Sequence, residues 1–596
     1  MRTLYKVFLV IIITGLAFSF KGFESPVSSK ISYTLNRALN IIPESEKILV
    51  WVDFKDKGSD VSLISHPDML LTEKSIERRG KVRNSSKLAD ITDLPVNPEY
   101  IDVVTSHGLE IRNVSKWFNS VSCYATKSQI ESLTGESCIK KIEIVARFKK
   151  SSTSKELIIE DNISTKKSVS NTQNDNSSIL NYGASFTQAD LINVPMAHDS
   201  GYTGKNVLIA VFDSGFDNLG HPCYDSIRAR GLRTRDFVNG DTSVANDPGQ
   251  MGNGSHGTRC LSLVVGYDPG ELIAPAFDSR VILAKTENTE SETPLEEDNW
   301  IAAAEWADSL GADIISASLT YKEMDPGSPY SYDYTWMNGD SCRITIAADL
   351  AVNKGIIVVN SAGNSGFDNV NTLGAPADGD SVFAIGSIDD NGQRSSFSSV
   401  GPTIDGRHKP DFMAMGRGNL TAASGSGNTG YTSFGSGTSF SCPMVAGVVA
   451  MILQANPTLT PMQVRDILRQ TSSNSSSPNS LIGWGTINAW NAIQLARTTS
   501  VDPISGNIPS NYKLGQNVPN PFNPTTSIPV TLTRGANISI KVFDMAGREA
   551  ATISRFLNAG AAEVPFNGAG LSSGVYFYAL IVDGAFVEAK KMMLMK

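Results

Sequence analysis

Three residue types that cooperate in nucleophilic catalysis occur in this chain at points where it turns sharply. Asp213 follows the apolar run Val207–Phe212, His256 stands among small residues in Gly254–Thr258, and Ser439 precedes a long apolar stretch. A serine hydroxyl needs a neighbouring base to act as a nucleophile at neutral pH. An imidazole base needs a carboxylate that fixes its tautomer and stabilises its charged form. The order Asp, His, Ser is one of three known chain orders for that geometry.

Each of these residues also has an ordinary structural explanation when it is considered alone. An Asp after a strand is most often a cap or turn residue, a His between glycines is often a loop residue, and a Gly/Ser-rich stretch before a helix is usually a capped turn. The three together favour a catalytic set. A further match, G-x-S-x-G at Gly570–Gly574, requires a helix after it, but the β-prone run Val575–Val582 follows. We therefore predict that Ser572 is a turn residue.

The elements around the three residues predict an α/β domain over residues 182–497. Short apolar runs, which we interpret as buried strands, alternate there with helical segments; the runs are Val207–Phe212, Val281–Ala284, Asp313–Ser316 and Ile356–Asn360. The predicted helices are Trp300–Leu310, Ile344–Lys354 and Met444–Ala455. Continuous apolar strands separated by helices indicate a parallel sheet covered on both faces. Active sites on such sheets lie at the carboxyl ends of the strands, which is where Asp213 stands.

Two smaller units flank this domain. Residues 47–148 read as a small α+β unit, with a strand at Ile48–Phe54 and a helix that starts after Asn97. Its other predicted elements are strands near Leu109–Val114, Val121–Tyr124 and Ile139–Ala146 and a helix near Ser128–Leu133. Residues 514–596 read as a small all-β sandwich, since Ile538, Ile540 and Val542 alternate with polar residues. Polar linkers are predicted at 149–181 and 498–513.

The beginning of the chain has the layout of a secretory signal peptide over residues 1–19. Arg2 and Lys6 form a short positive region ahead of the apolar run Val7–Phe20, and Ser19 stands at the small-residue position of a cleavage site. A membrane anchor would need about 20 apolar residues, and this run is shorter. We therefore expect export.

Length and charge exclude several classes of protein. At roughly 100–200 residues per domain, 596 residues predict several domains. The chain has 51 Lys+Arg against 60 Asp+Glu and a formal net charge of −9, which argues against nucleic acid as a partner. Six Cys do not make the scaffold of a small secreted domain, and none falls in a Cys-x-x-Cys pair that would indicate zinc.

The segments IAVFDSG, NGSHGT and GTSFSCP resemble the three active-site signatures of the subtilisin-like serine proteases, the S8 family. Further matches follow in the family's order; they are Asp313–Leu319, Ser361–Asn364, Ser399–Pro402, Lys409–Asp411 and Gly485–Ala489. The resemblance covers residues 182–497, about half of the chain. It implies a subtilisin-like three-layer catalytic domain that hydrolyses peptide bonds.

The resemblance also implies a role for each matching residue. Ser439 would be the nucleophile, His256 the general base and then acid, and Asp213 the residue that orients it. Asn364 would donate to the oxyanion together with the Ser439 backbone N–H. The substrate-binding edges of the cleft would be formed by Ser318, Leu319, Thr320, Ala362 and Gly363.

Some residues depart from the family pattern. Phe440 and Ser441 stand where Met and Ala are usual, and we interpret both as packing changes. Thr320 stands where Gly is usual, and we expect its side chain to narrow the first specificity pocket. Cys442 is predicted to be a small buried residue rather than a second nucleophile, and His198 a structural one.

The flanking units carry resemblances of their own. Residues 47–148, with Asp93–Val96 and Ser115–Asn119, resemble the propeptide of subtilisin-like proteases from the Bacteroidetes group. This implies a zymogen whose own propeptide is an intramolecular inhibitor, with the linker at 149–181 as the processing zone. The tail, with Gln516–Pro524 and a final Lys596, resembles the C-terminal sorting domain of type IX secretion cargo. That implies the type IX machinery as a partner and passage across both membranes to the cell surface or the medium.

The sequence thus favours a secreted serine endopeptidase, which we expect to be a monomer acting on polypeptides. A non-catalytic surface-displayed binding protein on the same fold is the alternative, and the β-rich tail could serve carbohydrate binding instead of sorting. No cofactor is expected to be required. Calcium is compatible with the resemblance, but no loop has a dedicated ligand spacing, so no ligands are assigned. Two disulfides are conceivable, Cys123–Cys138 and Cys223–Cys342, although spacing does not establish the pairing.

Overall fold

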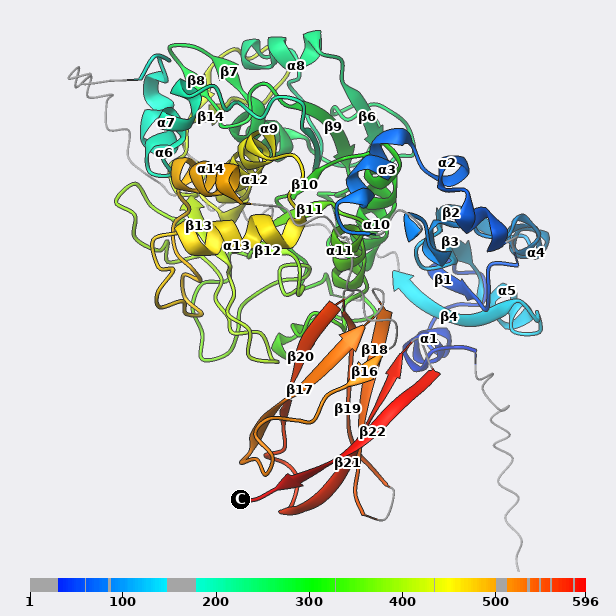
Figure 1. The fold of residues 1–596 in the computed structure, drawn as a ribbon. Coiled ribbons are helices and arrows are strands. Elements are labelled where there is room, and N and C mark those ends of the chain that lie inside the picture. The colour runs from blue at the N-terminus through cyan, green and yellow to red at the C-terminus, as the bar shows by residue number, and fades with distance from the viewer. Residues whose placement is uncertain are drawn as a thin grey trace, which may run out of the picture.

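The structure is a computed structural model that describes residues 30–58, 61–83, 87–146, 178–326, 328–433, 435–499, 512–532, 536–545, 548–557, 560–582 and 585–596. The predicted signal peptide (1–19) and most of the predicted linkers at 149–181 and 498–513 lie outside the described residues. Three units follow one another along the chain: an N-terminal unit (30–146), a central domain (178–499) and a C-terminal unit (512–596). Figure 1 shows them in blue to cyan, in turquoise through green and yellow to light orange, and in orange to red.

The N-terminal unit is a four-stranded antiparallel sheet in the order β2-β3-β1-β4, packed against helices. Its strands are β1 (Ile48–Phe54), β2 (Glu110–Ser115), β3 (Ser120–Ala125) and β4 (Ile139–Ala146). The helices α4 (Pro98–Ser106), capped by the Asn97 side chain, and α5 (Lys127–Leu133) confirm the predicted pair. Helices α1 (Tyr33–Leu39), α2 (Pro67–Leu70) and α3 (Glu73–Gly80) were not predicted.

The central domain is built on a seven-stranded parallel sheet in the order β13-β12-β11-β10-β5-β9-β6, which confirms the predicted α/β class. The strands are β5 (Leu208–Asp213), β6 (Arg233–Asp236), β9 (Arg280–Lys285), β10 (Ile314–Ala317), β11 (Ile357–Ser361), β12 (Phe383–Ile388) and β13 (Phe412–Met415). Four of them were predicted; β6, β12 and β13 were not.

Helices cover both faces of this sheet. Because side chains alternate along a strand, Ile209 and Val211 of β5 join a core with α9 (Ser255–Val265), α12 (Thr438–Ala455), α13 (Pro461–Thr471) and α14 (Ala489–Thr498). Leu208, Ala210 and Phe212 join a second core with α10 (Pro294–Ser309) and α11 (Arg343–Asn353). Helix α10 begins at Pro294 rather than at Trp300, because Thr293 and Glu296 form a capping box there.

The remaining elements of the central domain are short and lie in its connections. They are α6 (Phe186–Asp190), α7 (Val194–Asp199), α8 (Asp225–Ala229), β7 (Tyr267–Asp268), β8 (Leu272–Ile273), β14 (Thr421–Ala422) and β15 (Tyr431–Thr432). Short 3-10 turns occur at Val61–Ser65, Ile91–Asp93, Gly183–Ser185, Pro222–Tyr224 and Tyr334–Trp336.

Helix α12 is long and apolar enough to cross a membrane, the one such helix in the described part of the chain, but 89% of that window is buried inside the domain. We therefore interpret it as a core helix. The prediction that it starts at Met444 was wrong, since it begins at Thr438 and contains Pro443.

The C-terminal unit consists of two antiparallel sheets, β16-β17-β20 and β19-β18-β21-β22, which confirms the predicted all-β fold. Its strands are β16 (Lys513–Leu514), β17 (Thr525–Leu532), β18 (Ala536–Phe543), β19 (Glu549–Leu557), β20 (Gly560–Asn567), β21 (Gly574–Val582) and β22 (Ala585–Leu594). Ser572 lies just before β21, and its carbonyl accepts a hydrogen bond from the Tyr576 hydroxyl at 2.9 Å. No helix follows it, so it is a turn residue as predicted.

All six cysteines are buried and free, so the two conceivable disulfides are not formed. Cys223 and Cys342 belong to cores on opposite faces of the parallel sheet, which separates them. Cys123 lies on β3, Cys138 lies just before β4, and β1 runs between those strands. Two strand spacings of about 4.8 Å exceed the reach of a disulfide.

Candidate active site

Asp213 ends β5, a strand in the middle of the parallel sheet, and its carboxylate is fully buried. One oxygen, Oδ1, accepts hydrogen bonds from the Ser214 backbone N–H at 2.8 Å and from His256 Nδ1 at 2.8 Å. A carboxylate only accepts, so the imidazole carries its proton on Nδ1 and leaves Nε2 available as a base. The strand end thus holds the acid and the acid orients the imidazole.

His256 is the second residue of α9, and a glycine brings that helix up to the end of β5. A Cβ at Gly257 would lie 2.1 Å from the Gly215 carbonyl oxygen and 2.9 Å from Asp213 Cβ, so only glycine allows this approach. Burial of the imidazole disfavours its charge, but the neighbouring Asp213 carboxylate outweighs burial and raises the pKa of His256 well above its ordinary value.

Ser439 is the second residue of α12 and is 9% exposed. In the structure its hydroxyl donates to the Ser318 carbonyl at 3.1 Å rather than to His256. Hydrogen bonds of catalytic groups are often long or misaligned before substrate binds. The first turn of a helix presents backbone N–H groups and the positive end of the helix dipole, which favours negative charge near Ser439.

Pro443, inside α12, frees a carbonyl next to the nucleophile. A proline has no N–H for the carbonyl four residues earlier, and here that carbonyl belongs to Ser439. It accepts instead from Ser318 Oγ at 2.9 Å and lies 3.4 Å from Cys260 Sγ. Ser318 and Ser439 therefore hold each other through two reciprocal hydrogen bonds.

Asn364 is fixed by Thr438, the residue before the nucleophile. Its Oδ1 accepts from the Thr438 backbone N–H at 2.8 Å and from the Thr438 hydroxyl at 3.0 Å. Because the Thr438 N–H can only donate, the amide oxygen must face it and the NH₂ group turns the other way. Nδ2 lies 3.3 Å from where a Cβ at Gly437 would stand, so it faces the segment that carries Ser439.

The predicted cleft residues lie on two segments near Ser439. Ser318 bonds directly to Ser439, as described above. The next residue, Leu319, accepts at its carbonyl from Asn360 Nδ2 at 2.8 Å. On the other segment, the Gly363 N–H donates to the Thr438 hydroxyl at 3.2 Å. Thr320 Cβ lies 2.8 Å from where a Cβ at Gly374 would stand, so the Thr320 side chain packs closely against Gly374. Their substrate-binding roles stay predictions.

The structural predictions for two other residues are confirmed. His198 is buried between the Tyr182 hydroxyl, 2.5 Å from Nδ1, and the Pro275 carbonyl, 2.8 Å from Nε2, and burial lowers its pKa to about 4. Cys442 is fully buried, with Sγ 3.4 Å from the Val359 carbonyl. Phe440 packs against the base, with its ring centroid 5.8 Å from that of His256.

Cys260 is a residue of the site that sequence reasoning missed. It follows His256 by one helical turn, a spacing that could have revealed it, and Sγ lies 3.7 Å from His256 Nδ1. Asp213, His256 and Cys260 form the one group within the described residues whose three ligand atoms lie close enough to hold a metal ion. The group is a poor fit, because burial raises the pKa of the Cys260 thiol whereas metals bind the thiolate. In addition, Asp213 Oδ1 and His256 Nδ1 are already engaged in a hydrogen bond with each other.

Family models match each of the three units. The subtilase family matches residues 204–485, the Bacteroidota peptidase S8 propeptide domain matches 49–158, and the secretion system C-terminal sorting domain matches 518–595. The Subtilisin of Bacillus pumilus is 33% identical over 305 residues, which cover 51% of this chain and 96% of that protein. The chain belongs to the subtilase family.

Two further relatives of this subtilase are similar over the same part of the chain. Serine protease AprX of Bacillus subtilis (strain 168) is 31% identical over 323 residues, which cover 49% of this chain and 67% of AprX. Subtilisin NAT of Bacillus subtilis subsp. natto is 33% identical over 284 residues, which cover 47% of this chain and 64% of that protein. The chain thus spans about two thirds of the length of these two relatives.

The family matches decide between several of the alternatives. The chain is a subtilisin-like serine protease with a propeptide domain. The match over 518–595 identifies the C-terminal unit as a sorting domain rather than a carbohydrate-binding module. A sorting domain indicates export, with secretion or attachment at the cell surface.

Proposed function

We propose that this subtilase is a secreted serine endopeptidase, made as a zymogen, that hydrolyses peptide bonds with Ser439, His256 and Asp213. The observation that carries the proposal is the 2.8 Å hydrogen bond between buried Asp213 and His256, at the carboxyl end of the sheet and beside the helix that begins with Ser439. No structural reason requires a buried acid, an imidazole oriented by it and a serine at a helix start to meet at one place.

The reaction follows from these positions. Ser439 Oγ attacks the scissile carbonyl carbon while His256 Nε2 takes the hydroxyl proton, and Asp213 stabilises the imidazolium. The imidazolium then protonates the leaving amine, and the peptide bond breaks. Water repeats the sequence on the acyl-enzyme: His256 takes its proton, the hydroxide oxygen bonds to the acyl carbon, and Ser439 leaves with the proton returned.

Asn364 serves as a donor to the oxyanion in this scheme. Its NH₂ group is turned away from Thr438 by the two hydrogen bonds that its oxygen accepts. A donor held in place before the reaction costs no reorganisation when charge develops on the substrate oxygen. The Ser439 backbone N–H is the second donor of the proposal.

The cleft edges on either side of Ser439 would bind the substrate backbone and side chains. We assign Ser318, Leu319 and Thr320 to one edge and Ala362 and Gly363 to the other. The position of Thr320 against Gly374 supports a first specificity pocket narrower than one with glycine at position 320.

The N-terminal unit is the proposed intramolecular inhibitor, and acidic side chains of α10 support this role. Asp298 accepts hydrogen bonds from the side chains of Trp51 at 2.9 Å and of Ser122 at 2.7 Å, both from the N-terminal unit. Glu305 accepts from Ser115 Oγ at 2.5 Å and from the Lys116 backbone N–H at 3.0 Å. The unit is thus held on the domain at the precursor stage, and cleavage in the linker would release it.

The rest of the proposal concerns delivery and partners. The sorting domain would direct the exported chain across the outer membrane through the type IX machinery, after a signal peptide at residues 1–19 directs it across the inner one. The mature enzyme would act on polypeptides as a monomer, without nucleic acid. The chemistry above uses only the chain's own groups and requires no cofactor; calcium sites are not assigned.

Hydrolysis by the secreted protein tests the proposal. Wild type, Ser439→Ala and Ser441→Ala should be compared on an unfolded protein substrate after removal of the N-terminal unit. Ser441 is the control, because it lies on the same helix, is buried, and its hydroxyl donates within α12 to the Thr438 carbonyl at 3.1 Å. Wild type and Ser441→Ala should hydrolyse the substrate and Ser439→Ala should not. An inactive wild type, or an active Ser439→Ala variant, would overturn the proposal in favour of a non-catalytic binding protein.

A further inference from the structure

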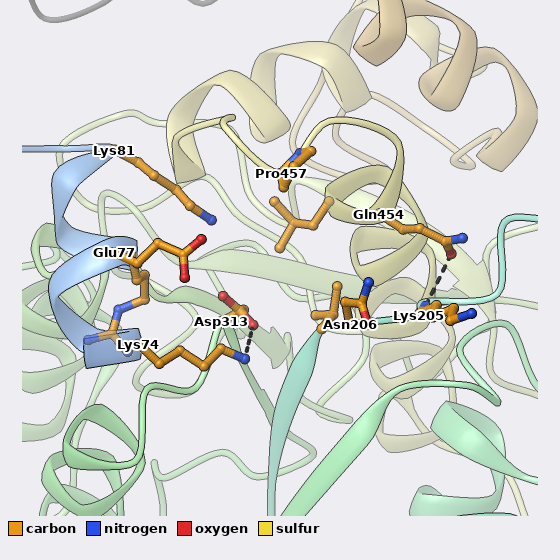
Figure 2. A pocket seen from close by; sticks show the side chains of 11 residues that line it. Lys74, Glu77, Lys81, Lys205, Asn206, Asp313, Gln454 and Pro457 are labelled. Carbon is orange, nitrogen blue, oxygen red and sulfur yellow. Dashed lines mark hydrogen bonds and ion pairs between the residues drawn. The ribbon is translucent and has the colours of Figure 1, made fainter. Parts of the chain in front are cut away.

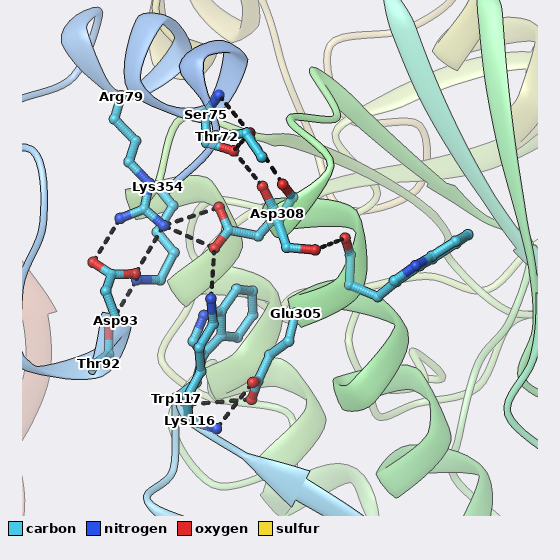
Figure 3. Close-up of polar contacts among 12 residues, drawn as sticks. Thr72, Ser75, Arg79, Thr92, Asp93, Lys116, Trp117, Glu305, Asp308 and Lys354 are labelled. Carbon is cyan, nitrogen blue, oxygen red and sulfur yellow. Dashed lines mark hydrogen bonds and ion pairs between the residues drawn. The ribbon is translucent and has the colours of Figure 1, made fainter. Parts of the chain in front are cut away.

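Helix α3 of the N-terminal unit lies against the carboxyl ends of two helices of the central domain, α10 and α11 (Figure 3). Gly311 and Gly355, which follow those helices, have φ of +77° and +89°. A Cβ at Gly311 would lie 2.7 Å from Lys74 Cβ, and one at Gly355 would lie 3.0 Å from the Arg78 carbonyl oxygen. The two glycines therefore both end their helices and leave room for α3.

The α3 segment supplies hydrogen-bond donors to carbonyls at these helix ends. The last carbonyls of an α-helix have no partner within the helix. Three side chains of the N-terminal unit donate to main-chain carbonyls there: Thr72 to Ser309 at 3.1 Å, Ser75 to Asp308 at 2.6 Å, and Arg78 to Ala312 at 2.7 Å and to Lys354 at 3.0 Å. The guanidinium also lies at the negative end of both helix dipoles, where a cation is favoured.

A buried network of charges links the two units at the same place. The Asp308 carboxylate, with no exposed surface, accepts a hydrogen bond from Arg78 Nη2. Arg79 Nη2 donates to both oxygens of the same carboxylate, to Oδ2 at 2.8 Å and to Oδ1 at 3.0 Å. Arg79 Nη1 also donates to Asp93 at 2.7 Å, and Lys354 Nζ donates to Asp93 at 2.8 Å. The two arginines and Asp93 belong to the N-terminal unit, whereas Asp308 and Lys354 belong to the central domain.

Arg79 also pairs with Asp93 inside the N-terminal unit, whereas Arg78, Asp308 and Lys354 find their ion-pair partners across the contact between the units. A buried charge is costly unless it is paired and hydrogen-bonded, and removing one member of a buried pair leaves the other uncompensated. An unrelated helix without cations at these two positions would leave buried Asp308 facing the Lys116 ammonium at 3.9 Å in place of two hydrogen-bonded guanidinium groups. Such a contact contributes little to affinity for helices in general, but it lowers the affinity for a helix that cannot pair with Asp308.

The contact borders a cavity beside α3. The cavity has a volume of about 300 Å³ and is lined by side chains of α3, Arg78 among them, and of the central domain; they include Lys74, Glu77, Lys81, Lys205 and Asp313 (Figure 2). Lys74 pairs with Asp313 at 2.9 Å, but Glu77 is exposed. The helix thus makes its buried contacts through one face, which carries Ser75, Arg78 and Arg79.

We propose that Asp308 is a recognition site for a propeptide helix that carries two adjacent arginines, and that this contact makes the central domain retain its own N-terminal unit selectively after the linker is cut. The inference rests on the proposed inhibitory role of that unit. The site is remote from Ser439. Its partner is a cationic helix whose neighbouring hydroxyl side chains donate to carbonyls at the end of α10.

The test measures release of the N-terminal unit from the full chain. A precursor carrying Ser439→Ala cannot cut itself, so limited trypsin at the linker lysines, such as Lys166 and Lys167, would nick it. Native mass spectrometry after dilution then gives the rate at which the N-terminal unit dissociates. Because this readout is binding, its outcome does not depend on whether the mature protein cleaves peptide bonds.

Two variants remove the contact from opposite sides. Asp308→Asn and the pair Arg78→Gln with Arg79→Gln should each speed release by about 30-fold or more, the lower end of the range for losing one partner of a buried charge pair. The combined variant should speed release by less than the product of the two separate acceleration factors, since both changes remove the same contact. Arg37→Gln is the matched control, because Arg37 is exposed on α1 and lies over Tyr33 of its own helix.

Unchanged release in the Asp308 and arginine variants, or effects that simply multiply, would overturn the proposal. If the Asp308→Asn precursor does not fold, Ser75→Ala decides, since it keeps every charge and, between the two units, removes the donor to the Asp308 carbonyl; the other contact it removes, with the Thr72 hydroxyl at 2.9 Å, lies within the N-terminal unit. We expect it to speed release several-fold, by about the worth of one hydrogen bond. Release equal to that of Arg37→Gln would contradict the proposed contact.

Discussion

Replacing Asp213 with Asn changes one atom of the buried group that orients His256. The side chain keeps its size, so the strand end should stay packed, but an amide can donate to Nδ1 as readily as accept from it. His256 would then carry its proton on Nε2 and lose its role as a base. The equivalent change in a protease of another fold lowers kcat by about 10⁴, which corresponds to about 5.5 kcal/mol at 1.36 kcal/mol per tenfold.

The same substitution should move the pH dependence of the residual activity. Burial disfavours the charged imidazole, and the Asp213 carboxylate overcomes this and holds the pKa of His256 above its ordinary value. The base works only when neutral, so wild-type activity should rise as the pH passes upward through this raised pKa. Removing the Asp213 charge removes the largest contribution that raises the pKa of His256, so the rise in activity should occur at lower pH.

Steady-state kinetics on a peptide substrate across the pH range checks both parts. Asp217→Asn is the matched control, because Asp217 accepts from the Thr258 hydroxyl at 2.7 Å and from the Gly425 N–H at 3.0 Å and does not contact His256. It should leave the position of the pH profile unchanged. A value of kcat for Asp213→Asn within tenfold of wild type, or an unmoved profile, would refute the assigned role of Asp213.

Further changes to the site and to the contact between the units should have separate effects. Asn364→Leu should lower kcat by about 100- to 1,000-fold with little change in KM, since an oxyanion donor is worth about 2.7–4 kcal/mol, a range whose reference case is itself a subtilisin; an equal rise in KM would instead mean lost substrate binding. Thr438→Val removes the hydroxyl that fixes the Asn364 amide and should lower kcat by about tenfold, whereas unchanged kinetics would contradict that positioning. Thr320→Gly should widen the side-chain preference in a peptide library, and an unchanged profile would remove the proposed narrowing. Burial opposes ionisation of Asp308, but its cationic neighbours outweigh burial and lower the pKa of Asp308. The charged carboxylate therefore stabilises the contact between the two units at neutral pH, and this stabilisation is lost as the pH falls through the lowered pKa. The nicked precursor should accordingly release its N-terminal unit faster in strong acid, and a release rate independent of pH would contradict this.

Much of the fold could be predicted because its signals are local. The strand at Ile48–Phe54 and the one that ends at Asp213 are runs of β-branched and aromatic residues, and both form as expected. The helix α3 escaped prediction because its sequence, EKSIERRG, is polar. Arg78 and Arg79 look like surface residues, yet their side chains are 1% and 0% exposed. Their partner, Asp308, lies far along the chain, where no local pattern connects it to them.

The active site was predicted in outline but not in its supporting contacts. The three motifs brought Asp213 and His256 together as expected, whereas the hydrogen bonds between Ser318 and Ser439 depend on two segments that meet only in the fold. The helix was predicted to begin at Met444, directly after Pro443, and proline usually breaks a helix. Here Ser318 and Cys260 satisfy the carbonyl it frees, so α12 runs through it.

The central claim, that Ser439 is a nucleophile activated by His256, is tested most directly by a fluorophosphonate probe followed by peptide mass mapping of the secreted protein. The reagent modifies a serine only when an adjacent base activates it. The account predicts one adduct, on the peptide that contains Ser439, which disappears in Ser439→Ala and His256→Ala and persists in Ser441→Ala. No adduct on the mature wild-type protein, or an adduct that persists in Ser439→Ala, would contradict it.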